Sequence, residues 1–139
     1  MRSVIQQSVV LPANAHQLFE MYLSPATHAA ITGQPVTIGE ASGSEFKAFE
    51  GQLSGTTLSV VRPQLIVQSW RSMMFKPDDD DSTLVLMFSP EPSDVADKPQ
   101  GRIDLIHLDV PDHDYQGVTE GWPKFYWTPW LNYLQRQGR

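Results

Sequence analysis

The sequence contains no cysteine, and this absence excludes several kinds of site at once. Without thiols there is no disulfide, no thiolate nucleophile and no cysteine-ligated zinc or iron–sulfur centre. Positive charge is also scarce, because 10 Lys and Arg stand against 16 Asp and Glu, for a formal net charge of -6. Surfaces that bind phosphate backbones or anionic lipids need clustered Lys and Arg. The composition therefore disfavours nucleic acid and anionic membranes as partners.

Long apolar segments are lacking too. The longest strongly apolar run, residues 84–88, is far shorter than the roughly 20 residues that span a bilayer. Residues 1–8 do not form the apolar region of a signal peptide. We therefore expect a cytoplasmic protein without membrane insertion. A length of 139 residues with 40% hydrophobic residues predicts one globular domain over residues 1–139.

The first third of the chain predicts a strand followed by two short helices. Apolar residues alternate over residues 3–11, as in a half-buried strand. They then recur at intervals of three and four over residues 15–23, with Asn14 as the candidate N-cap. Pro25 suits the first turn of a second helix, which we expect to stop at Gly33.

The middle of the chain predicts a series of short strands. Gly and Pro separate them so closely that no room remains for the long crossovers of a parallel sheet. We therefore expect antiparallel pairing of strands at residues 36–40, 44–50, 52–61, 65–72, 83–89 and 102–110. With the flanking helices, this order of elements indicates the α+β class.

Residues 115–139 are dense in aromatic side chains and predict a long closing helix. At helical spacing these side chains spread around most of the circumference, which is typical of a helix buried on several sides. Pro129 lies inside this segment and removes one backbone hydrogen bond to Phe125. We therefore expect a kink at this point.

A curved antiparallel sheet buries its concave face only if another element covers it, and the aromatic helix can do so. An incomplete seal leaves a cavity, which is the usual form of a small-molecule site. Glu50 and Arg71 stand near strand ends, where they either orient a ligand or form a structural ion pair or face water. The predicted cavity lining consists of Phe46, Glu50, Trp70, Arg71, Phe88, Trp122, Phe125 and Tyr126.

Two other patterns suggest metal binding, and each has a simpler explanation. His107 and Asp109 are two apart on a strand and would share a face, which could begin a metal site with His113 and Asp114. They also fit the polar end of a strand. The acidic run at residues 78–81 lacks the Gly and Glu spacing of a calcium loop and fits a solvated hairpin. No Gly-x-Ser-x-Gly nucleophile elbow occurs. We assign no catalytic residue, metal or cofactor.

Six short motifs are distributed from residue 28 to residue 129: HAAITG at 28–33, GSEF at 43–46, FEG at 49–51, RPQLIVQSWR at 62–71, HLDVP at 107–111 and GWPKFYWTP at 121–129. In this order they resemble bacterial proteins related to the activator of the ninety-kilodalton heat-shock chaperone ATPase. That family belongs to the START/SRPBCC, or birch-pollen-allergen-like, superfamily. The resemblance implies a helix-grip fold, in which a curved antiparallel sheet of about six to seven strands wraps around a long C-terminal helix, with two short helices after the first strand.

The resemblance narrows the function without choosing it, because the superfamily includes lipid carriers, hormone receptors and polyketide cyclases. The leading hypothesis is non-catalytic binding of a small, largely apolar ligand between sheet and helix. One alternative is a protein-interaction or chaperone-linked module of the stress response, which would use the acidic loops or the outer face of the sheet to bind a chaperone or another protein. The other is a cavity hydrolase or cyclase, with Glu50, Asp104, His107 and Tyr126 as candidate titratable groups.

Overall fold

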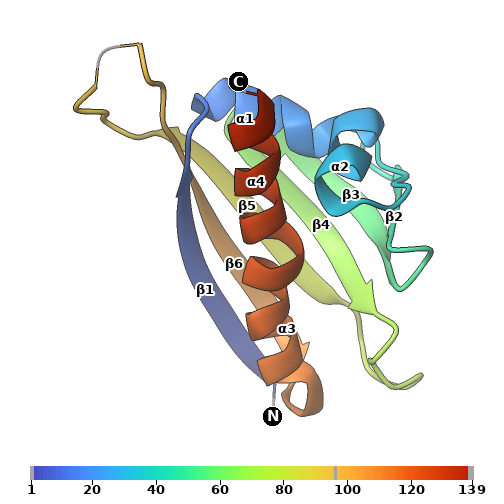
Figure 1. The fold of residues 1–139 in the computed structure, drawn as a ribbon. Coiled ribbons are helices and arrows are strands. Elements are labelled where there is room, and N and C mark those ends of the chain that lie inside the picture. The colour runs from blue at the N-terminus through green and yellow to red at the C-terminus, as the bar shows by residue number, and fades with distance from the viewer. Residues whose placement is uncertain (1, 96, 138–139) are drawn as a thin grey trace.

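A computed structural model describes residues 2–95 and 97–137 of the chain. Over these residues a six-stranded antiparallel sheet curves around a long C-terminal helix (Figure 1). The strand order is β1-β6-β5-β4-β3-β2, so β1 and β6 form the one pair in the described sheet whose strands are not consecutive in sequence. The predicted helix-grip α+β fold is confirmed. The elements before the closing helix are β1 (Arg2–Leu11), α1 (Ala15–Leu23), α2 (Pro25–Thr32), β2 (Glu45–Ala48), β3 (Leu53–Val61), β4 (Leu65–Ser72), β5 (Ser82–Pro90) and β6 (Gly101–Pro111).

The closing helix runs from residue 112 to residue 137 in four parts. These are the 3-10 turn η1 (Asp112–Asp114), α3 (Tyr115–Trp122), the π-helical turn η2 (Pro123–Trp127) and α4 (Thr128–Gln137). The ring of Pro129 would press on the carbonyl four residues earlier in a regular helix, and a wider turn just before it relieves that crowding. The helix therefore continues past Pro129. None of the helices in the described chain combines the length and apolar character needed to cross a membrane.

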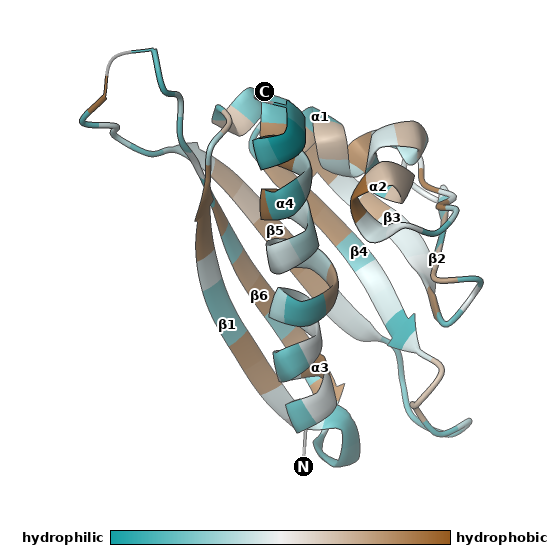
Figure 2. Cartoon of the chain, in the orientation of Figure 1, coloured by the Kyte–Doolittle hydropathy of each residue, from teal (hydrophilic) through white to brown (hydrophobic). Residues whose placement is uncertain are grey.

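The π turn also explains why aromatic residues that regular helical spacing would spread around the axis gather on one side. It brings residues five apart onto one face, and the rings of Trp122 and Trp127 stack with centroids 5.5 Å apart. Figure 2 shows hydrophilic residues, in teal, at intervals along the outward face of the closing helix. The helix is thus buried along one broad face, with Phe125 left 45% exposed.

The predicted strand at residues 36–40 is wrong. Only Thr37 pairs there, through two 2.9 Å backbone hydrogen bonds with Lys47. The carbonyl of Gly39 instead accepts a hydrogen bond from the hydroxyl of Thr57, so the backbone leaves the ladder after one residue. Side-chain bonding that competes with strand pairing is typical of Ser and Thr beside a turn.

The sheet separates a buried concave face from a half-exposed convex face. Along β4 and β5, buried and half-buried residues alternate almost without interruption, because successive side chains point to opposite faces. The closing helix covers the concave face, and α1 and α2 close one end of it (Figure 1). There the ring of Phe19 packs edge-on against Phe88, with centroids 5.6 Å apart.

Candidate ligand-binding site

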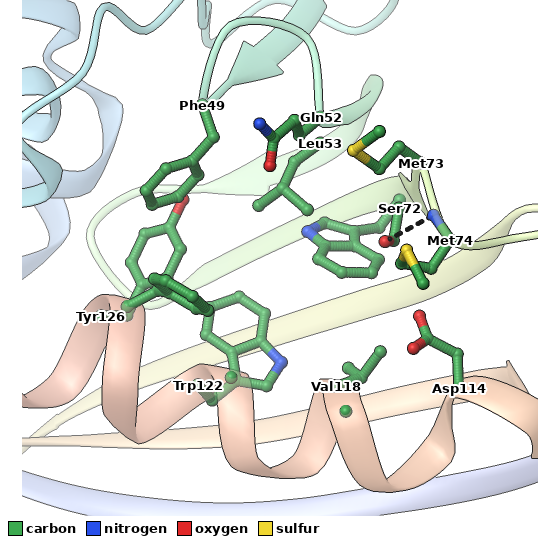
Figure 3. Close-up of a pocket in the computed structure, with 14 residues that line it drawn as sticks. Phe49, Gln52, Leu53, Ser72, Met73, Met74, Asp114, Val118, Trp122 and Tyr126 are labelled. Carbon is green, nitrogen blue, oxygen red and sulfur yellow. Dashed lines mark hydrogen bonds between the residues drawn. The ribbon is translucent and has the colours of Figure 1, made fainter.

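A cavity of about 380 Å³ lies between the sheet and the first half of the closing helix. Its walls come from the turn between β2 and β3, from the end of β4 and from α3 and η2 (Figure 3). The lining is mostly apolar, and exposed methionines stand on one side of it. The fourteen lining residues are Phe49, Gln52, Leu53, Trp70, Ser72, Met73, Met74, Asp114, Gly117, Val118, Gly121, Trp122, Phe125 and Tyr126.

The sheet wall begins with Trp70 and Ser72, which are two apart on β4 and therefore face the helix together. The hydroxyl of Ser72 accepts a 3.1 Å hydrogen bond from the backbone N–H of Met74 (Figure 3). Met73 and Met74 follow with exposed fractions of 65% and 64%. Unbranched thioether side chains adapt to many shapes, so this wall can adjust to what enters.

The helix wall depends on residue spacing. Val118, Trp122 and Tyr126 lie at four-residue intervals, and all three side chains are buried. Gly117 and Gly121 come directly before Val118 and Trp122, and they present no side chain to the cavity. A Cβ added at Gly121 would meet only the ring of Phe125, at 3.6 Å. The two glycines therefore leave open the volume that larger residues would fill.

Phe49 reaches the cavity through an unusual backbone conformation. Phe49 and Glu50 have φ angles of 53° and 57°, and Gly51 follows at 86°. Positive φ is uncommon for residues other than Gly and tends to occur at ligand sites and tight turns. The ring of Phe49 meets Phe125 and Tyr126 edge-on, at centroid distances of 5.5 and 6.2 Å. These contacts offset part of the strain of the turn.

A buried hydrogen-bond chain holds Tyr126 in place. Its hydroxyl donates to Nε2 of His28 at 2.8 Å, and Nδ1 of His28 donates to the carbonyl of Tyr22 at 2.9 Å. The hydroxyl of Tyr22 in turn donates to Oε1 of Gln68 at 2.6 Å. Burial lowers the pKa of His28 to about 4 and raises the pKa of Tyr126 above its usual range. The pair is therefore neutral at pH 7, with the proton on Tyr126.

A second buried chain lies behind the cavity wall. Nε2 of His107 donates to the hydroxyl of Ser82 at 2.8 Å, which donates to the carbonyl of Trp70 at 2.7 Å. The indole N–H of Trp122 donates to Nδ1 of His107 at 3.2 Å. Burial lowers the pKa of His107 to about 3. This neutral histidine does not line the cavity, and it links the two tryptophans that do.

The expectation that His107 and Asp109 share a face is wrong. Between the Ser3–Val110 and Ile5–His107 pairs, β6 carries one more residue than β1, which makes a β-bulge. Asp109 has a φ of 61° and an exposed side chain, whereas His107 is fully buried. Within residues 2–95 and 97–137, no three His, Asp or Glu side chains gather to hold a metal ion.

Of the predicted lining residues, Trp70, Trp122, Phe125 and Tyr126 surround the cavity. Phe46 is fully buried deeper in the core, with its ring 6.1 Å from that of His28. Phe88 packs against α1 at the closed end of the sheet, as described above. Both are concave-face residues, and neither is among the side chains that line the cavity.

Glu50 and Arg71 lie outside the cavity lining. Glu50 is exposed in the turn after β2. Arg71 follows Trp70 on β4 and therefore points to the convex face. Its guanidinium donates to the carbonyls of Lys76 and Asp79 at 2.6 and 2.8 Å, and these bonds anchor the acidic hairpin. The structural alternative for Arg71 fits these contacts.

Three of the ten remaining lining residues have a pattern that points to them. Steps of four back from Trp122 reach Val118 and then Asp114, and a step of two from Trp70 reaches Ser72. The turn residues carry no comparable signal, because only the folded backbone brings them to the cavity. The lining residues that sequence reasoning missed are Phe49, Gln52, Leu53, Ser72, Met73, Met74, Asp114, Gly117, Val118 and Gly121.

Residues 12–128 match a protein family described as "Activator of Hsp90 ATPase homolog 1-like protein". No curated protein matches the chain in sequence. Among solved structures, an HSP90 activator from Plasmodium falciparum is similar, with a TM-score of 0.76, 16% identity and coverage of 90% of this chain and 91% of that one. A protein from Mesorhizobium loti has a TM-score of 0.78 at 17% identity, covering 96% and 98%. The Aha1 dimer from Colwellia psychrerythraea has a TM-score of 0.70 at 9% identity, covering 91% and 92%. At these identities the likeness shows the fold.

Proposed function

We propose that this chain, which belongs to the family of Activator of Hsp90 ATPase homolog 1-like proteins, binds a small, largely apolar molecule without catalysis. The proposed site lies between the curved sheet and the helix that crosses it. The observation that carries this proposal is the cavity of about 380 Å³. Its size is within the range of small-molecule sites, and an apolar lining with few polar groups is their usual character.

The state of the titratable groups supports binding in place of catalysis. Tyr126 lines the cavity, but its hydroxyl is committed to His28, and burial shifts the two pKa values in directions that oppose proton transfer. A general acid or base works best with a pKa near the working pH. The pair is therefore suited to positioning the Tyr126 ring.

The other candidate groups for a hydrolase or cyclase lie away from the cavity. Asp104 accepts hydrogen bonds from Ser8 and Arg102. Glu50 is exposed in its turn, and His107 is enclosed behind the tryptophans, as described above. None of the three is among the residues that line the cavity.

The test is binding of N-phenyl-1-naphthylamine, a neutral apolar dye whose fluorescence rises in apolar surroundings. We expect saturable binding to the wild-type chain and its loss in Gly121→Leu, which places a side chain in the cavity. Gly at a helix interior is destabilising by about 1 kcal/mol relative to good helix formers, so Gly121→Leu is expected to fold. Gln116→Leu adds the same side chain at an exposed position of α3 and is the matched control.

Two results would count against ligand binding. One is the absence of saturable dye binding to the wild-type chain. The other is equal binding by Gly121→Leu and the wild type, because the dye would then occupy a different surface.

A second candidate is a chaperone-linked role, which the family description favours because it refers to activation of an Hsp90 ATPase. The acidic hairpin offers a surface for it. Asp79 pairs with His113 at 2.8 Å and Asp81 pairs with Arg71 at 3.1 Å, so both hold the hairpin in place. The double variant Asp78→Asn, Asp80→Asn removes two charges and leaves those pairs intact.

The measurement is the ATPase rate of an Hsp90-class chaperone with and without the chain. This candidate predicts stimulation by the wild type that the double variant weakens. An unchanged ATPase rate with the wild-type chain would remove the candidate, and equal stimulation by the double variant would move the contact away from the hairpin.

A further inference from the structure

The cavity lining carries a single formal charge, the carboxylate of Asp114. Five of the other lining residues are aromatic, and Lys, Arg and His are absent among the described residues that line it. Figure 3 shows the carboxylate pointing from the helix toward Met74, across one end of the cavity. An apolar chamber with one negative group at its end selects for charge as well as for shape.

This carboxylate has no partner within the described chain. Asp114 precedes α3, but its side chain does not cap the helix. No described residue donates a hydrogen bond to it or forms an ion pair with it, and among the described residues the charge that acts on it is that of its neighbour His113. Partial burial raises the pKa of Asp114, because the half-buried carboxylate loses part of its water without gaining a donor. A bound cation would supply the missing partner.

The spacing along the helix sets the shape of the occupant. Trp122 follows Asp114 by eight residues, which places them about 12 Å apart along the axis. The rings of Trp70, Trp122 and Tyr126 form a continuous series, with neighbouring centroids 6.1 and 4.8 Å apart. The apolar end of the cavity is thus separated from the carboxylate by two helical turns.

We propose that the occupant is an elongated organic cation, with an aromatic or aliphatic body among the rings and a protonated amine beside Asp114. This inference rests on the proposed function, because it names the chemical class of ligand for the same cavity. Pairing with an amine restores the interaction that the carboxylate lost on burial. A ligand that ends in a carboxylate meets like charge at the same place.

Three probes of one shape test the proposal: 4-phenylbutylamine, 4-phenylbutanol and 4-phenylbutyrate. At pH 7 they end in a cation, a neutral hydroxyl and an anion. Their affinities are measured by isothermal titration calorimetry, and NMR chemical-shift changes at Trp70 and Trp122 report that the cavity is occupied. We expect the amine to bind about tenfold more tightly than the alcohol, the size of one modest charge pair, and the acid to bind most weakly.

The variant Asp114→Asn keeps the shape of the side chain and removes its charge. We expect it to weaken binding of the amine by about tenfold and to leave the alcohol within about twofold. Asp112→Asn makes the same change of net charge two residues away, outside the lining, and is expected to leave all three affinities unchanged.

The outcomes separate the two proposals. If the alcohol binds and the amine binds no more tightly, the assignment of a cationic ligand is overturned while ligand binding in the cavity stands. Equal weakening of the amine by Asp112→Asn and Asp114→Asn also overturns it, because the effect would then come from the general field of the protein. If none of the three probes binds to the wild type, both proposals fall.

Discussion

The two buried histidines predict that the protein loses stability steeply between pH 6 and pH 5. His28 and His107 are 1% and 0% exposed, and burial lowers their pKa values from 6.5 to about 4 and about 3. Below pH 6.5 the unfolded chain binds protons at both sites, whereas the folded chain does not. Because the unfolded state binds more protons, the free energy of unfolding falls as pH falls.

The magnitude follows from proton linkage. Each histidine contributes a slope of about 1.4 kcal/mol per pH unit, from just below pH 6.5 down to its folded-state pKa. Two histidines together remove roughly 2–3 kcal/mol of stability between pH 6 and pH 5. Arg62 lowers the pKa of Glu20, and loss of that contribution is centred below the ordinary value of 4.5. Burial raises the pKa of Asp114, which acts in the opposite direction because the folded chain then binds the additional proton. The fall in stability between pH 6 and pH 5 is therefore assigned to the histidines.

The assay is urea unfolding followed by tryptophan fluorescence at several pH values in that interval. His107→Gln keeps a donor for Ser82 and is expected to halve the slope, in addition to a constant loss of about 1–3 kcal/mol from the unpaired Trp122 N–H. His16→Gln is the comparison for the loss of an exposed histidine, because 66% of the His16 side chain is exposed. If the free energy of unfolding of His107→Gln fell with pH as steeply as that of the wild type, the reasoning would be refuted. That result would mean that His107 takes up a proton in the folded state.

Two further predictions concern packing around the closing helix and the sheet. Tyr126→Phe leaves Nε2 of His28 buried without a donor and is expected to lower the free energy of unfolding by about 1–3 kcal/mol in urea titrations. Tyr133→Phe is the control, because the hydroxyl of Tyr133 has no hydrogen bond in the described chain. Equal effects of the two variants would contradict the assignment of the Tyr126–His28 hydrogen bond. Gly55→Ala places a Cβ 1.9 Å from the carbonyl oxygen of Ser69, and it is expected to cost about 3 kcal/mol or more by thermal unfolding. Gly121→Ala brings its Cβ into ordinary contact with the Phe125 ring, at 3.6 Å, and is expected to be neutral or stabilising. A mild effect of Gly55→Ala would show that β3 and β4 can separate.

The architecture follows from patterns that act over short distances. Alternation along β4 and β5 depends only on the period of a strand, and the Asn14 N-cap needs only a side chain three residues before the backbone N–H of Gln17. These local rules, together with the family motifs, were sufficient to predict the helix-grip fold. The strand at residues 36–40 failed because the hydroxyl of Thr57, distant in sequence, bonds to the Gly39 carbonyl.

The lining of the candidate site was predicted only where it belongs to helices and strands, because local periodicity fixes the face on which such a residue lies. Trp70, Trp122 and Tyr126 belong to regular elements, so their faces can be assigned from spacing, and all three line the cavity. Arg71 was placed beside Trp70 in the predicted lining, although neighbours on a strand point to opposite faces. Phe49 was missed because its orientation comes from a turn with positive φ, which no propensity of Phe indicates.

The amino-acid sequence by itself determined the order of the elements, the kinds of partner that the charge balance disfavours and the aromatic character of the closing helix. Each of these depends on residue type and local period. The tertiary structure alone decided two further features. It buried His107 and exposed Asp109 through the bulge in β6, and it placed Asp114 beside the cavity with no partner among residues 2–95 and 97–137. Both depend on how segments far apart in the chain meet, and such meetings are set by packing that no local pattern records.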